Sequence, residues 1–142
     1  MSENKLFPAS VIGSMPRSDF VKDLVLGDAE ISPEEYNKRI DAAVRYIVSV
    51  QEQAGVDVLN DGEWRRKSYI GVIAELAHGF ELSRADDGRP WTVVTGKVES
   101  KNPGFISREV EFVRDITTRQ IKATLPSPAL LGERMWDPEL SK

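Results

Sequence analysis

Apolar residues recur at helical spacing in one long segment of the chain, from Ser32 to Gly55. Ser32 suits the N-cap, Pro33 the first helical position and Glu35 the third, where it would complete a capping box. The inward-facing positions follow every three or four residues: Tyr36, Ile40, Ala43, Val44, Ile47, Val50, Gln51 and Ala54. Gly55 suits the C′ position that ends a helix. The pattern therefore predicts one long amphipathic helix with both ends marked.

Three short apolar runs rich in β-branched residues predict strands. They cover about Ala9–Ile12, Val56–Asn60 and Arg119–Leu125. Helical patterns separate them, over Ser18–Leu26 and the long helix before the second run, and over Phe105–Thr117 before the third. A strand that directly follows a long helix is typical of a βα repeat, so we expect a parallel sheet.

Other segments add to this α/β pattern. Two more helices are expected, over Ser68–Ala77 with His78 at its end, and from Ser127 onward. Phe80–Leu82 and Trp91–Val98 predict a hairpin-like β excursion. In the Phe105–Thr117 helix we expect an apolar face and a solvent-facing side. The apolar face holds Val110, Val113 and Ile116, Ser107 is a candidate cap, and Glu109, Glu111 and Arg114 face solvent.

Composition narrows the function classes. The chain has 142 residues, with 19 Lys and Arg against 23 Asp and Glu, so its net charge is −4. It therefore has no basic field for nucleic acid or an anionic membrane. It has no cysteine and one histidine, which excludes disulfides, thiolate metal sites and a cysteine nucleophile. No signal peptide or membrane span is evident, so we expect a cytoplasmic protein.

Two polar turns follow the first two predicted strands. Gly13, Ser14 and Arg17 could cradle a carboxylate or phosphate, or simply form a strand-end turn. Asp61 and Glu63 could form an acid/base pair. The alternative is a turn aspartate beside a glutamate that is salt-bridged to a neighbouring arginine, Arg65 or Arg66. Trp64 could stack on a substrate ring or pack over the mouth of a barrel.

Three sequence blocks resemble one known family. They are Phe7–Arg17, Gln53–Glu63 with Arg66, and Ile121–Pro128. They are similar to the N-terminal part of the catalytic barrel of cobalamin-independent methionine synthase, in the superfamily that includes uroporphyrinogen decarboxylase. The resemblance implies an α/β fold of about three to four βα units, the N-terminal portion of a TIM (β/α)8 barrel with an extra β excursion. We expect one partial-barrel domain over residues 1–142.

The resemblance also implies a substrate site. In the family, the Ile-Gly-Ser turn and the Gly-Glu carboxylate hold homocysteine, which here points to Ile12, Gly13, Ser14 and Glu63. Backbone N–H groups suit a substrate carboxylate and a glutamate suits an ammonium. Further substrate-binding candidates stand in the same turns: Arg17, Asp61 and Arg66. Arg66 would position Glu63 or reach the methyl-folate donor, and Arg89 is a weaker candidate for contacting the folate.

Other features set this chain apart from the family. The family's catalytic zinc is held by His, Cys and Glu from later strands, so we expect neither zinc ligands nor catalytic residues within this chain. Asp61 stands where many members of the family have histidine. The segment Trp64–Tyr69 is more basic and aromatic than the corresponding loop of methionine synthase. The expected function is the homocysteine-binding part of a methyltransferase, with the zinc-binding half either missing or on another chain. A homo-oligomer or a partner chain could complete the barrel. The alternatives are a non-catalytic or truncated thiol-binding module, and a relative acting on another thiol such as coenzyme M.

Overall fold

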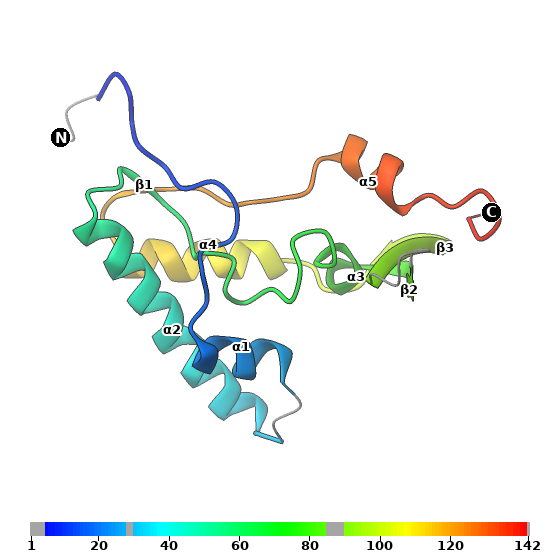
Figure 1. The fold of residues 1–142 in the computed structure, drawn as a ribbon, viewed down its shortest axis with the longest axis horizontal. Coiled ribbons are helices and arrows are strands. Elements are labelled where there is room, and N and C mark those ends of the chain that lie inside the picture. The colour runs from blue at the N-terminus through cyan, green and yellow to red at the C-terminus, as the bar shows by residue number, and fades with distance from the viewer. Residues whose placement is uncertain (1–4, 28–29, 85–89, 142) are drawn as a thin grey trace. The chain divides into compact units, whose positions relative to one another are not determined.

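The computed structural model describes residues 5–27, 30–84 and 90–141 (Figure 1). The chain forms two compact units. The first comprises Met1–Arg66 and Ile106–Thr124, and the second comprises Lys67–Phe105 and Leu125–Lys142. The expectation of one domain over residues 1–142 stays a prediction.

The first unit packs two helices of the N-terminal half around a shared apolar face. The helices are α1 (Asp19–Leu26) and α2 (Pro33–Gln53), and most of α4 (Phe105–Ile116) belongs to the same unit. Its core is made of apolar side chains from these helices, β1 and the turn after it: Val21, Leu24, Val25, Ile40, Ala43, Val44, Ile47, Val48, Leu59, Trp64 and Val113. Five of them are residues that the helical spacing predicts to face inward: Ile40, Ala43, Val44, Ile47 and Val113.

Both ends of α2 follow the predicted signals. Ser32 Oγ accepts a hydrogen bond from the Glu35 backbone N–H at 3.2 Å. The Glu35 carboxylate accepts from Arg39 Nε at 2.6 Å, one turn along the helix, so the capping box is formed on its serine side. At the other end Gly55 adopts φ +77°, the left-handed conformation of a C′ residue.

The parallel sheet is present but shorter than predicted. β1 (Val58–Leu59) pairs in parallel with β4 (Gln120–Ile121), and Ser10 forms a parallel bridge to Val58. The predicted strand over Ala9–Ile12 is thus reduced to one bridge. A physical reason is that side chains occupy backbone acceptors along these segments. Lys122 Nζ donates to the Val11 carbonyl and Arg119 Nη1 to the Val56 carbonyl.

The second unit contains the predicted β excursion. β2 (Ala77–Arg84) and β3 (Pro90–Ser100) form an antiparallel pair with an irregularity between His78 and Phe80. Gly79 adopts φ +89° there, and a Cβ atom at this position would lie 2.6 Å from the Lys97 carbonyl oxygen. Only glycine fits such a close approach. The other elements of the unit are α3 (Ile73–Leu76) and α5 (Pro128–Met135), whose N-cap Ser127 accepts from the Leu130 N–H.

The predicted helix over Ser68–Ala77 is largely wrong. Only Ile73–Leu76 is helical, and turns precede it. Ala77 pairs with Ser100 in the hairpin, so the β ladder takes the residue that the helical pattern claims. His78 therefore lies in β2 and is exposed.

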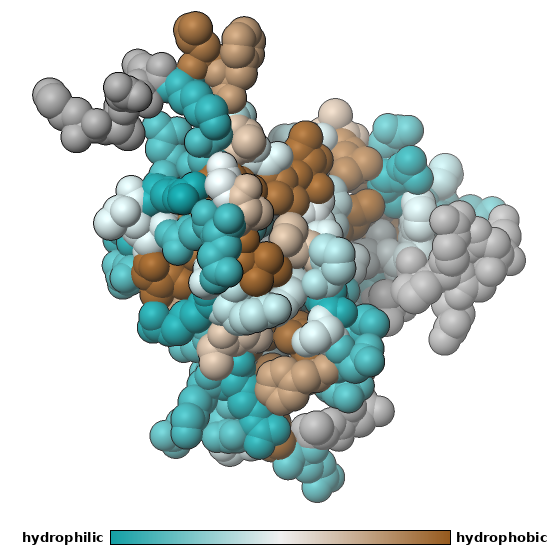
Figure 2. All heavy atoms as spheres, turned by 60° about the vertical axis from the view of Figure 1, so that its left-hand side comes forward, coloured by the Kyte–Doolittle hydropathy of each residue, from teal (hydrophilic) through white to brown (hydrophobic). Residues whose placement is uncertain are grey.

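Hydrophobic side chains also reach the surface, as the face in Figure 2 shows. The large ones that are exposed include Leu6, Phe7, Ile12, Phe20, Leu26, Tyr46, Val98, Leu125, Trp136 and Leu140. Among these, Phe20 lies in α1, whose buried residues are Val21, Leu24 and Val25. Within the described residues, no helix has the length and apolar character needed to cross a membrane.

Candidate functional site

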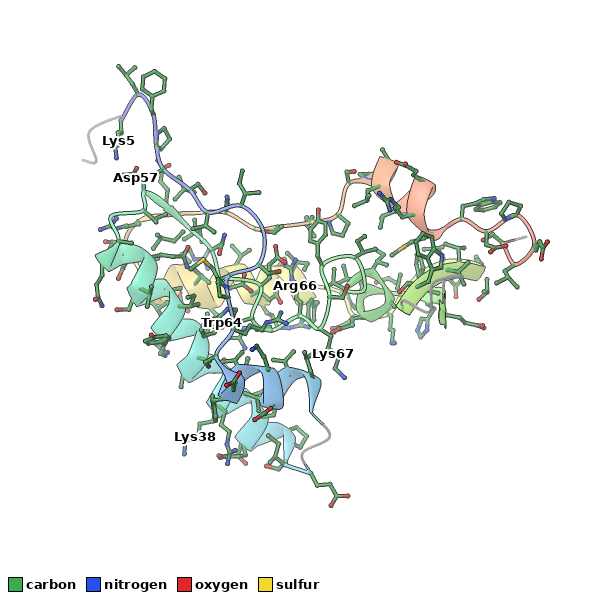
Figure 3. The ribbon with its side chains drawn as sticks, viewed as in Figure 1. Lys5, Lys38, Asp57, Trp64, Arg66 and Lys67 are labelled. Atoms are coloured by element: carbon green, nitrogen blue, oxygen red, sulfur yellow. The ribbon has the colours of Figure 1, made fainter. Side chains whose placement is uncertain are left out.

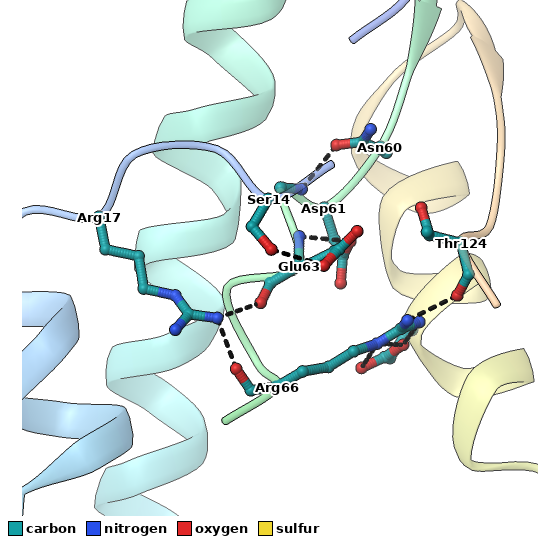
Figure 4. Close-up of polar contacts among 9 residues, drawn as sticks. Ser14, Arg17, Asn60, Asp61, Glu63, Arg66 and Thr124 are labelled. Atoms are coloured by element: carbon teal, nitrogen blue, oxygen red, sulfur yellow. Dashed lines mark hydrogen bonds and ion pairs between the residues drawn. The ribbon is translucent and has the colours of Figure 1, made fainter. Parts of the chain in front are cut away.

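The candidate site is the turn from Asn60 to Arg66, at the C-terminal end of β1 (Figure 4). Short local hydrogen bonds shape it. Asn60 Oδ1 accepts from the Gly62 N–H at 2.7 Å, and Asp61 Oδ1 accepts from the Glu63 N–H at 3.0 Å. From α2, Gln51 donates to the Asn60 carbonyl at 2.9 Å and accepts from the Asn60 N–H at 3.2 Å. The polar residues of the turn thus serve first to fix its backbone.

Glu63 is the most constrained residue of this turn. It adopts φ +58°, and among the described residues no other non-glycine has a positive φ. Its side chain is 1% exposed. Oε2 accepts from Ser14 Oγ at 2.6 Å, while Oε1 is buried without a hydrogen-bond partner. A buried carboxylate oxygen without a donor is costly and calls for an explanation, such as a bound ligand.

The Ile12–Arg17 segment lies along the turn. The Met15 N–H donates to the Gly62 carbonyl at 3.0 Å. Arg17 Nη2 donates to the carbonyls of Glu63 at 2.6 Å and Arg66 at 2.5 Å. Gly13 adopts φ +78° with open space where a Cβ would stand, and the Ile12 side chain is 93% exposed. The structure therefore brings Ser14 and Arg17 onto the turn, while the Ile12 side chain faces solvent.

Arg66 is buried in an ion pair. Its guanidinium is 2% exposed and donates through Nη2 and Nε to Glu109 Oε2, at 2.6 and 3.2 Å. Nη1 donates to the Thr124 carbonyl at 2.5 Å. The prediction that Glu109 faces solvent is wrong, because the residue is only 6% exposed and is the charge partner of Arg66. One signal could have revealed it: Glu109 is one turn before the buried Val113.

The charges of this ion pair respond to burial and to each other. For the carboxyl of Glu109, burial is the larger effect and raises its pKa, although the hydrogen bonds from Arg66 oppose it. Burial lowers the pKa of Arg66, but the bonds and charge of Glu109, with the charges of Asp61 and Glu63, outweigh burial and raise that pKa overall. Arg66 therefore stays a cation, and its charge is matched mainly by Glu109.

A small pocket lies beside this ion pair. Its lining combines charged and apolar side chains: Asp61, Arg66, Glu109, Val110, Val113, Ile121, Lys122 and Ala123. Asp61 is 8% exposed, and its Oδ2 is buried without a partner. Two acidic and two basic side chains therefore balance one another around the pocket.

The two remaining side chains of the turn have packing roles. Trp64 is buried in the core, 6.3 Å from the Tyr46 ring, and its indole N–H donates to the Met15 carbonyl at 3.2 Å (Figure 3). Arg65 pairs with Asp41 at 2.6 Å and lies over the Phe112 ring. Trp64 thus packs into the core, a position that neither alternative for it specified. Neither arginine carries the glutamate salt bridge considered for Glu63.

The described residues offer no donor set for zinc. They contain no group of three or more His, Cys, Asp or Glu side chains that could hold a metal ion, and the chain has no cysteine. The zinc that the family resemblance implies does not fit these residues. Arg89, the candidate for a folate contact, lies outside the described residues.

Comparisons with known proteins agree on one family. The family model described as "Cobalamin-independent synthase, Catalytic domain" matches residues 7–128. The chain is 29% identical to a methionine synthase of Sulfolobus acidocaldarius over 92% of its own length and 41% of that protein. It is 30% identical to a 5-methyltetrahydropteroyltriglutamate–homocysteine methyltransferase of Thermotoga petrophila, over 87% of its length and 18% of that protein. The chain thus spans less than half the length of these relatives.

A solved structure confirms the fold prediction. The B12-independent methionine synthase of Shewanella sp. W3-18-1, solved in complex with selenomethionine, is similar with a TM-score of 0.73 and 25% identity. The match covers 97% of this chain and 43% of that one. The fold is therefore α/β and forms part of a TIM barrel. The likeness does not test the substrate-binding residues, which stay predictions.

Proposed function

Because the chain belongs to the cobalamin-independent synthase catalytic-domain family, we propose that it supplies the amino-acid-binding part of a methyl-transfer site. The ligand is homocysteine or a similar amino-acid thiol. The observation that carries this proposal is the Glu63 carboxylate, with one oxygen bonded to Ser14 and the other buried without a donor. A ligand ammonium would give Oε1 the donor it lacks, and a charge-assisted bond of that kind is among the strongest in proteins.

The neighbouring turn suits the other end of an amino acid. The Ser14 hydroxyl donates its hydrogen to Glu63, so the donors left for a substrate carboxylate are backbone N–H groups. Gly13 has open space beside it and a left-handed backbone. Successive backbone N–H groups in such a turn form a cradle for a carboxylate. We assign the substrate carboxylate to this backbone, at Ile12, Gly13 and Ser14.

The relatives support the same ligand class. The similar Shewanella structure contains selenomethionine, an α-amino acid with the same ammonium and carboxylate as homocysteine. The Thermotoga relative is named for methyl transfer from 5-methyltetrahydropteroyltriglutamate to homocysteine. We propose this reaction for the assembly in which the barrel is complete, with the rest of the barrel or a partner chain supplying the reacting groups. Zinc would make the substrate thiol a thiolate, but the described residues do not fit a zinc ion.

A calorimetric titration of L-homocysteine into the 142-residue chain tests the assignment. Glu63→Gln keeps the shape of the side chain and removes its charge, so affinity should fall about ten- to hundredfold. Glu111→Gln, an exposed position on α4, is the matched control and should bind like wild type. 4-Mercaptobutyrate lacks the ammonium, so its affinity should be the same for wild type and Glu63→Gln. Unchanged homocysteine binding by Glu63→Gln would show that the assigned role is wrong.

A binding module without turnover is the second candidate, favoured by the lack of a metal-binding cluster among the described residues. A methyl-transfer assay with methyl-folate and homocysteine distinguishes it from an active enzyme. Coenzyme M is the informative alternative thiol. It has no ammonium, so binding of coenzyme M that is insensitive to Glu63→Gln would favour a relative that acts on a different thiol.

A further inference from the structure

Arg17 joins the candidate site through the main chain. Its Nη2 donates to the carbonyl oxygens of Glu63 and Arg66, at 2.6 and 2.5 Å (Figure 4). These two carbonyls lie on either side of the tight turn that carries Trp64 and Arg65. The Glu63 carbonyl also accepts from the Arg66 N–H at 3.2 Å. The Arg17 guanidinium therefore bridges the two ends of the turn, which the hydrogen bond between the Arg66 N–H and the Glu63 carbonyl also joins.

The backbone that Arg17 engages is strained. Glu63 adopts φ +58°, a conformation that a non-glycine residue takes only rarely and keeps only where the surrounding structure imposes it. The local bonds of the turn act on the N–H groups of Gly62 and Glu63. Arg17 acts on the carbonyl side of the strained residue, which makes its contribution complementary to those of Asn60 and Asp61.

We propose that Arg17 is a positioning residue: it holds Glu63 in the left-handed conformation and so fixes the Glu63 carboxylate against Ser14. The consequence for the ligand rests on the proposed function, whereas the effect on the turn does not. A charged donor shared between two carbonyls makes stronger bonds than a neutral one. The guanidinium is planar and always charged, which suits two acceptors held at fixed positions.

Amide hydrogen exchange of the 142-residue chain, followed by NMR, tests the effect on the turn without any ligand. In Arg17→Met the amides of Trp64 and Arg66 should exchange at least tenfold faster, while those of Val44 and Ile47 in α2 keep their rates. Arg17→Lys should lie between wild type and Arg17→Met, since an ammonium can donate but lacks the planar fork. The matched control, Arg39→Met, removes the same charge from an exposed pair with Glu35 and should change none of these rates.

A second background tests the role of strain. Asparagine tolerates the left-handed region better than glutamate. In Glu63→Asn, adding Arg17→Met should therefore accelerate exchange in the turn less than threefold. Unchanged exchange of the turn in Arg17→Met would overturn the proposal. Equal acceleration in α2 would also overturn it, because Arg17 would then act on global stability. A tenfold effect that persists in Glu63→Asn would contradict the link to strain.

A homocysteine titration separates this inference from the proposed function. If wild type binds homocysteine, Arg17→Met should bind it at least tenfold more weakly. If wild type does not bind it but the turn of Arg17→Met exchanges faster, the proposed ligand fails and the positioning role stands. If wild type and Arg17→Met bind equally despite faster exchange in the turn, positioning by Arg17 has no bearing on the site and the inference fails.

Discussion

Removal of the Glu109 carboxylate would leave the Arg66 guanidinium buried without its charge partner. The pair has little solvent to screen it, since the two side chains are 2% and 6% exposed. Three N–O distances join them, at 2.6, 3.2 and 3.5 Å. After Glu109→Ala the Thr124 carbonyl would remain as a hydrogen-bond acceptor, but it cannot neutralise the charge.

The expected loss for Glu109→Ala is about 3–5 kcal/mol of unfolding free energy, the usual cost of breaking a buried ion pair from one side. This is a large part of the roughly 5–15 kcal/mol that stabilises a typical protein. The ion pair itself need not be strongly stabilising. Replacing both partners by apolar residues, as in Arg66→Met with Glu109→Leu, should therefore recover most of the loss.

Urea unfolding of wild type, Glu109→Ala and the double variant measures these differences in unfolding free energy through the transition midpoints. Glu111→Ala is the matched control, because it removes an exposed carboxylate from the same helix and should stay within about 0.5 kcal/mol of wild type. The reasoning would be refuted if Glu109→Ala were as stable as Glu111→Ala. A double variant less stable than Glu109→Ala would contradict the claim that the unpaired charge is the main cost.

Three further substitutions test the geometry around β1. Gly62→Ala should lower the unfolding free energy in urea by about 1–3 kcal/mol, since Gly62 has φ +70° and a Cβ would lie 3.2 Å from both Met15 and Trp64. Gly55→Ala, at φ +77° with open space, should cost less; equal costs would mean that crowding is unimportant. The Lys5 hydrogen bond, then the Ala9 N–H, lowers the pKa of Asp57 (Figure 3). The stabilisation that the Asp57 carboxylate provides is therefore present above its unfolded-state pKa and is lost as the pH falls through its folded-state pKa. Asp57→Asn lacks this carboxylate, so its melting temperature should decrease less steeply than that of wild type below about pH 4. Parallel acid profiles for wild type and Asp57→Asn would contradict this.

Local signals predicted the elements whose formation is decided locally. The α2 helix begins at Ser32 and ends before Gly55, as its cap residues indicate. The parallel pairing of β1 with β4 follows from the order of helices and strands. The helix expected over Ser68–Ala77 ends at Leu76 because Ala77 pairs with Ser100, a partner that helical periodicity cannot reveal.

The contacts of the candidate site were harder to predict because their partners are distant in sequence. Arg66 and Glu109 are separated by 43 residues in sequence. The sequence of α4 has an ordinary amphipathic pattern, in which Glu109 is one charged residue beside the apolar face. The Arg17 bonds are harder still. Their acceptors are backbone carbonyls 46 and 49 residues away, and every residue type carries such a carbonyl. Pattern and resemblance selected the residues, but only the fold assigns each one a partner.

The constraints on Glu63 bear on what this chain can do without the rest of a barrel. The Glu63 N–H donates to Asp61, the Glu63 carbonyl accepts from Arg17, and the Glu63 carboxylate accepts from Ser14. All three partners lie in the first unit. A site whose carboxylate is fixed before the ligand arrives loses less entropy on binding. The amino-acid binding that we propose would therefore depend on residues in the described part of the chain. In the proposed function, the groups that react in methyl transfer come from outside these residues, so we expect experiments to separate binding from turnover.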